Sequence, residues 1–205
     1  MASDAAIERE LTTEWADLLA SPVSPAAEML ARATAPRVSK PMLSAALEEV
    51  LFRFGELLPE ASLRASETIT SLWTMKDLVA HMASWATEFV REVDIASRAE
   101  PFDYMIQFPM PVGPTAWNHR EVERRGARSF DDCAREFAAG TLGLQQLALA
   151  LPEDVLSRRT AFPLTPDGRA ETRWQVRIAD LVLMKTDHDL YHIGRIERWL
   201  RSGEY

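Results

Sequence analysis

Four long stretches of this chain carry apolar residues at the three- and four-residue spacing of an α-helix, and prolines or glycines separate them. They cover residues 39–58, 74–96, 129–151 and 176–201. A helix with one apolar face has to bury that face against other helices. The pattern therefore predicts an all-α fold, a four-helix bundle formed by residues 39–205. We interpret residues 1–38 as an N-terminal helical extension.

Two sequence motifs mark the starts of predicted helices. Thr74-Met-Lys-Asp77 and Ser129-Phe-Asp-Asp132 each place a hydroxyl at the N-cap and a carboxylate three residues later, which is a capping box. Pro59 predicts that the first helix ends before it. Gly140, inside the third stretch, weakens that helix by ~1 kcal/mol of intrinsic propensity relative to alanine.

The connections between the stretches differ in length. Residues 101–114 hold four prolines and are predicted to form a long loop, which joins parallel neighbours or crosses the end of the bundle. A short helix is predicted from Thr115 to Gly126. The turn at residues 165–168 predicts a small hairpin that pairs residues 162–164 with residues 169–172.

Composition and charge exclude several classes of function. Lys and Arg number 23 against 31 Asp and Glu, which gives a net charge of −8. Because no basic stripe is present, we expect neither nucleic acid nor an anionic membrane surface as a partner. No apolar run approaches the ~18 residues of a membrane span. With one cysteine and no signal pattern, we expect a cytoplasmic protein.

Cys133 is that single cysteine, and three acidic residues lie near it in the sequence. Neighbouring acids raise the pKa of a thiol, so a nucleophilic role is disfavoured. We predict a small buried side chain instead.

Two histidines share one face of the fourth stretch. His188 and His192 are four residues apart, so their side chains lie one above the other on a helix. The same face carries the apolar residues from Leu181 to Trp199. Two unpaired imidazoles on a buried stripe would cost free energy, and a divalent cation would satisfy both. Hydrogen bonds to aspartates or backbone groups are the alternative.

His81 occupies a comparable position in the second stretch. If the second and fourth helices are neighbours, three imidazoles could hold one ion and leave a coordination position open, which favours chemistry over a structural role. Such a set suits zinc or nickel, and also iron or cobalt. Metal affinity is expected to fall as the pH drops below about 6.5, because ligand histidines must be neutral. His119 is predicted at the surface or on a pocket rim.

Further side chains are candidates for a pocket beside such an ion. They are Trp85, Glu88, Asn118, Tyr191 and Arg195. Each also has a simpler structural role, such as core packing for the two aromatic residues and ion pairs or solvation for the two charged ones. Asp77 is assigned to its capping box. Asp187 and Asp189 are predicted to point to other faces than His188 and to be solvated.

Two segments resemble signatures of the DinB-like superfamily of four-helix-bundle metalloenzymes. Residues 73–85, Trp-Thr-Met-Lys-Asp-Leu-Val-Ala-His-Met-Ala-Ser-Trp, resemble the second-helix signature. Residues 187–199, Asp-His-Asp-Leu-Tyr-His-Ile-Gly-Arg-Ile-Glu-Arg-Trp, resemble the fourth-helix signature. Trp117-Asn118, followed by Arg124-Arg125 and Ser129, is similar to the entry of the third helix. The resemblance covers residues 39–201.

The resemblance implies a bundle with a long crossover and a metal ion held at positions that match His81, His188 and His192. It also implies isomerisation or transfer chemistry with a low-molecular-weight thiol, such as mycothiol or bacillithiol, and a homodimer. Our first hypothesis is a metal-dependent enzyme that acts on a small electrophilic molecule by thiol transfer, isomerisation or hydrolysis. The alternatives are a non-catalytic module that binds a metal or a small ligand, and an interaction protein whose histidines bind no metal.

Overall fold

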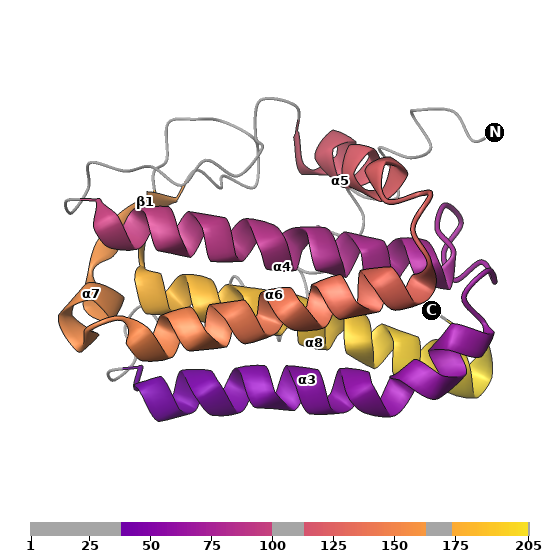
Figure 1. Ribbon diagram of the computed structural model, residues 1–205, viewed down its shortest axis with the longest axis horizontal. Coiled ribbons are helices and arrows are strands. Elements are labelled where there is room, and N and C mark those ends of the chain that lie inside the picture. Colours follow the sequence, from indigo (N-terminus) through magenta and orange to yellow (C-terminus); the bar gives the residue numbers. More distant parts are fainter. Residues whose placement is uncertain (1–37, 100–112, 163–173, 205) are drawn as a thin grey trace.

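The computed structural model describes residues 38–99, 113–162 and 174–204. Four long helices lie side by side (Figure 1): α3 (Lys40–Leu63), α4 (Met75–Arg98), α6 (Phe130–Ala150) and α8 (Ile178–Ser202). The shorter elements are α5 (Gly113–Arg124), α7 (Glu153–Ser157), β1 (Arg159–Phe162) and β2 (Trp174–Arg177). The predicted all-α bundle is confirmed. The extension predicted at residues 1–38 lies almost entirely outside the described residues. None of the described helices has the length and apolar character needed to cross a bilayer.

Helices α4 and α6 are parallel neighbours. Gly140 of α6 lies against Ala86 of α4, and Gly143 lies against Val90, so the pairing advances in the same direction on both helices. Helices α3 and α8 run the opposite way (Figure 1). The long link that contains α5 therefore joins parallel neighbours, which is one of the two arrangements expected from its length.

Both predicted capping boxes begin a helix. The Thr74 hydroxyl accepts a hydrogen bond from the Asp77 backbone N–H at 3.2 Å, and the Thr74 N–H donates to Asp77 Oδ2 at 3.1 Å. Ser129 and Asp132 repeat this arrangement at the start of α6. Asp77 thus has the capping role that the sequence predicted.

Helix α3 does not end before Pro59, and this prediction was wrong. The helix continues to Leu63 with the proline inside it. A proline within a helix removes the hydrogen bond to the carbonyl four residues earlier, here that of Gly55. Both residues are exposed, so water can satisfy that carbonyl, and the helix bends toward its C-terminal end (Figure 1).

The hairpin lies closer to the helices than the sequence predicted. Strands β1 and β2 are antiparallel, with a register from Arg159↔Arg177 to Phe162↔Trp174. The predicted strand residues, apart from residue 162, fall outside the described residues. The Ile178 N–H donates to the Arg158 carbonyl at 3.0 Å, so the hairpin leads directly into α8. It thereby sets where the helix that carries two histidines begins.

Two apolar clusters fill the bundle, and a polar layer separates them along α8. One cluster includes Leu181 and Val182, and the other includes Ile193 and Ile196. The polar side chains between them are Lys185, His188, Asp189 and His192. Because buried polar groups cost free energy unless they are paired, this polar layer marks a candidate functional site.

We expect the substitution Gly140→Ala to destabilise the protein. A Cβ at this position would lie 2.7 Å from Ala86 Cβ and 3.1 Å from the Ala86 carbonyl carbon, so α6 would have to move away from α4. Overpacking of this kind costs about 1–3 kcal/mol, and a contact as short as 2.7 Å belongs toward the upper end of that range, above the ~1 kcal/mol gained in helix propensity. Urea-induced unfolding measures the difference.

Gly143→Ala is the matched control on the same helix. Its Cβ would meet only Val90 Cγ2, at an ordinary contact distance of 3.7 Å, so this variant should be as stable as the original chain or more stable. If Gly140→Ala were equally well tolerated, the close approach of α4 and α6 would be contradicted.

Candidate metal centre

Three histidines from two helices meet inside the bundle. His81 comes from α4, and His188 and His192 come from α8. One ring nitrogen of each lies within 4.8 Å of the other two. The Nε2 atoms of His81 and His188 are 3.2 Å apart, and the ring centroids of His188 and His192 are 4.6 Å apart. The side chains that the sequence predicted to converge do lie together, and their binding of an ion stays a prediction.

This set of donors fits a divalent ion. His81 and His192 are buried, and His188 keeps 18% of its side chain exposed. Two nitrogen ligands of a tetrahedral zinc ion, at about 2.0–2.1 Å each, are separated by about 3.3 Å. The 3.2 Å between His81 Nε2 and His188 Nε2 is close to that value. In the described part of the chain, no other group of three or more metal-ligating side chains is present.

Burial keeps these imidazoles in their neutral form. Loss of solvent lowers the pKa of His81 and of His192 well below the usual value, and nearby positive groups lower it further. Burial also lowers the pKa of His188, although Asp189 acts in the opposite direction. Neutral imidazole is the form that binds a metal ion, so the low pKa values prepare all three rings as ligands.

The lowered pKa values predict that the metal-free protein loses stability in acid. A histidine in the unfolded chain takes up a proton near pH 6.5, whereas the folded imidazoles do so only at lower pH. The unfolded chain therefore binds more protons, and the free energy of unfolding declines as the pH falls below about 6.5. Metal binding should persist to a lower pH than free histidine would allow.

Urea midpoints of the metal-free protein, measured between about pH 7.5 and pH 5.5, test this expectation. The midpoint should fall across this interval, and the fall should be smaller in the His192→Gln variant. A midpoint that does not change with pH would contradict the burial of neutral histidines.

Asp189 lies directly behind His188, in contrast to the solvated position predicted for it. It is fully buried, its Oδ1 is 3.2 Å from His188 Nδ1, and its Oδ2 accepts a hydrogen bond from the buried Lys185. The prediction was wrong because α8 packs against α3, α4 and α6, so more than one stripe of this helix is covered. The four-residue spacing of Lys185 and Asp189, typical of a helical ion pair, was the available signal. Asp187 is half-buried.

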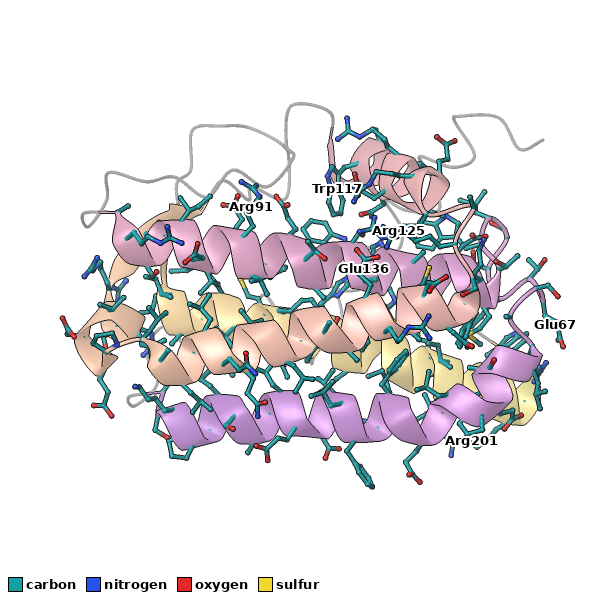
Figure 2. All side chains as sticks on the ribbon, in the orientation of Figure 1. Glu67, Arg91, Trp117, Arg125, Glu136 and Arg201 are labelled. Atoms are coloured by element: carbon teal, nitrogen blue, oxygen red, sulfur yellow. The ribbon has the colours of Figure 1, made fainter. Side chains whose placement is uncertain are left out.

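Trp85 and Asn118 lie beside the three histidines. The Trp85 ring centroid is 6.1 Å from that of His188 and 6.5 Å from that of His81. Its Nε1 donates a hydrogen bond to Asn118 Oδ1 at 2.9 Å, and Asn118 is buried. Figure 2 shows the neighbouring Trp117 projecting from α5 toward α4, where its ring lies 4.5 Å from that of Trp85. Helix α5 therefore contributes to the surroundings of the site.

The remaining pocket candidates separate into two groups. The Tyr191 ring packs edge-on against His192 at 5.2 Å, and the Tyr191 hydroxyl accepts a hydrogen bond from Arg195 at 2.5 Å. The charge of Arg195 contributes to the low pKa of His192. Glu88 instead forms an ion pair with Arg91 on the next turn of α4, which is its simpler structural role.

Three buried side-chain nitrogens have no hydrogen-bond partner within the described part of the chain. They are Trp73 Nε1, His81 Nδ1 and His119 Nε2. All three belong to rings in contact, because the Trp73 centroid lies 5.0 Å from that of His81 and 6.0 Å from that of His119. His119 is half-buried, and its predicted position at the surface or on a pocket rim stays a prediction. Unpartnered polar groups thus gather next to the histidine cluster.

Cys133 is not part of this site. It is fully buried in the apolar core, and burial, followed by the charge of Glu136, raises the pKa of its thiol. A buried thiol with a raised pKa is a poor nucleophile, which agrees with the predicted packing role.

A family model for the mycothiol maleylpyruvate isomerase N-terminal domain matches residues 43–183, which is more than half of the chain. The chain belongs to this family. The family is part of the DinB-like four-helix superfamily, so the resemblance seen in the sequence is confirmed. The match includes His81 and ends before His188 and His192. No curated protein and no solved structure matches the chain.

Proposed function

We propose that this chain is a metal-dependent enzyme that uses a low-molecular-weight thiol to isomerise a small electrophilic molecule or to transfer the thiol onto it. The observation that carries the proposal is the cluster of three neutral imidazoles in a member of a family whose description names a mycothiol-dependent isomerase. A divalent ion held by His81, His188 and His192 would lower the pKa of a thiol or water in its open position and supply a nucleophile near neutral pH. We expect zinc or nickel, and iron or cobalt also suits these ligands.

The charges around the cluster support an anionic ligand in the open position. The three imidazoles are neutral, and the charges of Lys185 and Asp189 cancel within their ion pair. Within the described residues, the group of potential ligands contains no carboxylate. Because no protein anion would neutralise the ion directly, a thiolate or hydroxide would be favoured over a neutral ligand.

Side chains next to the cluster support a small polar substrate. Trp85 and Trp117 are buried beside the cluster on the α4 and α5 side, where their rings pack against each other. On the α8 side, Arg195 carries a positive charge beside His192, and its hydrogen bond to Tyr191 makes that hydroxyl a stronger donor. A substrate with an electron-poor carbon and an acidic group would find both an apolar face and polar partners there.

Two measurements test the proposal. Elemental analysis of the purified full chain should find a divalent metal at a stoichiometry near one per chain. The metal-loaded protein is then mixed with mycothiol or bacillithiol and a panel of electrophiles that includes unsaturated dicarboxylates, epoxides and activated halides. We expect turnover only when both the metal and the thiol are present.

Other outcomes favour the remaining hypotheses. Turnover that needs the metal but no thiol would show hydrolysis. A protein that binds a metal but turns over no member of the panel would favour the non-catalytic binding module. Absence of bound metal after addition of zinc, nickel, iron and cobalt in turn would rule out both metal hypotheses. The homodimer stays a prediction, which the mass of the purified chain in solution checks.

A further inference from the structure

We propose that Asp189 is a positioning residue of the metal centre, which holds His188 in the tautomer and orientation that direct its Nε2 toward the ion, and that Lys185 holds Asp189 in place. This inference rests on the proposed metal site. It assigns a role to two buried charged residues that coordinate nothing themselves, both on α8 within four residues of His188.

The contacts of the His188 ring carry the first step. Its Nδ1 is 3.2 Å from Asp189 Oδ1, and its Nε2 is 3.2 Å from His81 Nε2. A neutral imidazole has one N–H, and an ionised carboxylate only accepts hydrogen bonds. The proton of neutral His188 therefore belongs on Nδ1, which leaves the lone pair of Nε2 directed at the other histidines. Ligand histidines in metal sites almost always donate their second N–H to an acceptor, and a carboxylate is one of the common ones.

The contacts of Lys185 carry the second step. Its ammonium group donates to Asp189 Oδ2, so the two oxygens of this carboxylate are divided between Lys185 and His188. The same ammonium lies 5.0 Å from the centroid of the Phe137 ring, which adds a cation–π contact. Lys185 and Asp189 are both fully buried. With both ends held, the carboxylate has a fixed direction before any ion arrives.

Stability alone does not account for this ion pair. Replacing a buried ion pair by apolar side chains of similar volume is often neutral or stabilising, because both charges have to be desolvated. The pair lies in the polar layer of α8 and makes its additional hydrogen bond to a candidate ligand. His81 differs, because its Nδ1 has no partner within the described residues and its ring is held by packing against Trp73. Of these two histidines, His188 is the one with a carboxylate at its second ring nitrogen.

The test compares zinc affinity with folding in matched variants. Asp189→Asn keeps the shape and removes the charge, and Lys185→Met with Asp189→Leu replaces the pair by apolar side chains that should allow folding. Asp180→Asn is the control, because Asp180 is also buried on α8 and paired, with Arg177, at the start of the helix. Zinc competition with a chelator measures affinity, and urea unfolding of the metal-free proteins measures stability.

We expect zinc affinity to fall about 10–100-fold in Asp189→Asn and in the double variant, and to remain unchanged in Asp180→Asn even where the latter loses stability. A spectroscopic readout separates positioning from a structural role. In the metal-free original chain, the ring ¹⁵N shifts should show the signals of one histidine in the Nδ1–H tautomer. These signals are assigned to His188 if they disappear in the His188→Ala variant. In the double variant, this ring should lose its preference for that tautomer.

The outcomes separate this inference from the proposed function. If the original chain binds zinc and both Asp189 variants bind it equally well, the positioning role is overturned and the metal site stands. An equal loss of affinity in Asp180→Asn, or a His188 tautomer that is unchanged in the double variant, also overturns it. If the original chain binds none of zinc, nickel, iron and cobalt, the proposed metal site fails and the inference fails with it.

Discussion

Replacing His188 by alanine is expected to abolish stoichiometric metal binding while the bundle stays folded. The apparent free energy of zinc binding at four-ligand sites is about 10–16 kcal/mol, so the loss of one ligand is worth about 3 kcal/mol, or more than a hundredfold in affinity. His188 is half-buried on α8, and alanine has the highest helix propensity, so the helix should persist. Elemental analysis and circular dichroism of the same sample measure the two effects.

His119→Ala is the matched control for this experiment. His119 lies on α5 and contacts Trp73, but it is not one of the three histidines whose ring nitrogens converge. We expect this variant to hold as much metal as the original chain. The ligand assignment would be refuted by a His188→Ala protein that keeps both the stoichiometry and the affinity of the original chain.

The second large effect is expected at Arg125, which is buried between α5 and α6. Its guanidinium donates to the Glu121 carboxylate at 2.8 Å and to both oxygens of Glu136, at 2.6 Å and 3.1 Å. Figure 2 shows Arg125 and Glu136 at this junction. Burial by itself would lower the pKa of Arg125, but the two glutamates raise it above its usual value. Burial would likewise raise the pKa of Glu136, but its contacts with Arg125 and the neighbouring arginines lower it. The charges therefore stabilise one another.

Arg125→Met should lower the free energy of unfolding by about 3 kcal/mol, because it leaves two glutamates without their shared cation. This value is at the lower end for buried pairs, since Glu136 is 20% exposed and keeps its contact with Arg128. The melting temperature should fall by about 6–12 °C. Thermal and urea unfolding measure the change. The stability of Arg125→Lys should lie between that of the original chain and that of Arg125→Met. Lysine keeps the positive charge but cannot make the two-pronged contact with a carboxylate.

Arg124→Met provides the comparison for Arg125. Arg124 also pairs with Glu121, at 2.7 Å, but its side chain is 61% exposed, so its removal should change stability by less than about 1 kcal/mol. If the two methionine variants were equally stable, the network around Arg125 would have no particular role. Because α5 carries Asn118, loosening this helix should also weaken the hydrogen bond from Trp85 beside the histidines.

Interactions between residues close in the chain were predictable. The capping boxes at Thr74 and Ser129 were read correctly because a hydroxyl and a carboxylate three residues apart satisfy each other's backbone N–H groups within one turn. The four-residue spacing of His188 and His192 placed both on one face, because helical geometry alone determines which side chains are neighbours.

Interactions between distant segments were harder to predict. The predictions that were wrong concern positions whose exposure depends on which other helices pack against them. Asp189 was expected in solvent because it lies outside the apolar stripe of α8, but three other helices cover a wider part of that surface. The helix past Pro59 persists because the carbonyl that loses its hydrogen bond is on an exposed turn. Asp189 is buried because other helices cover it, and the turn at Pro59 stays helical because, among the described residues, none covers its exposed carbonyl.

The sequence by itself determined the approximate ranges of the long helices, how α4 and α6 begin, and which histidines share a face, because these properties depend on propensities and spacings within a few turns. Only the tertiary structure decided that α4 and α6 run in parallel, that His81 meets the two histidines of α8, and that Lys185 and Asp189 are buried behind them. The physical reason is that burial and pairing belong to the packed bundle as a whole. A side chain loses its water, and requires a partner, only when another segment covers it.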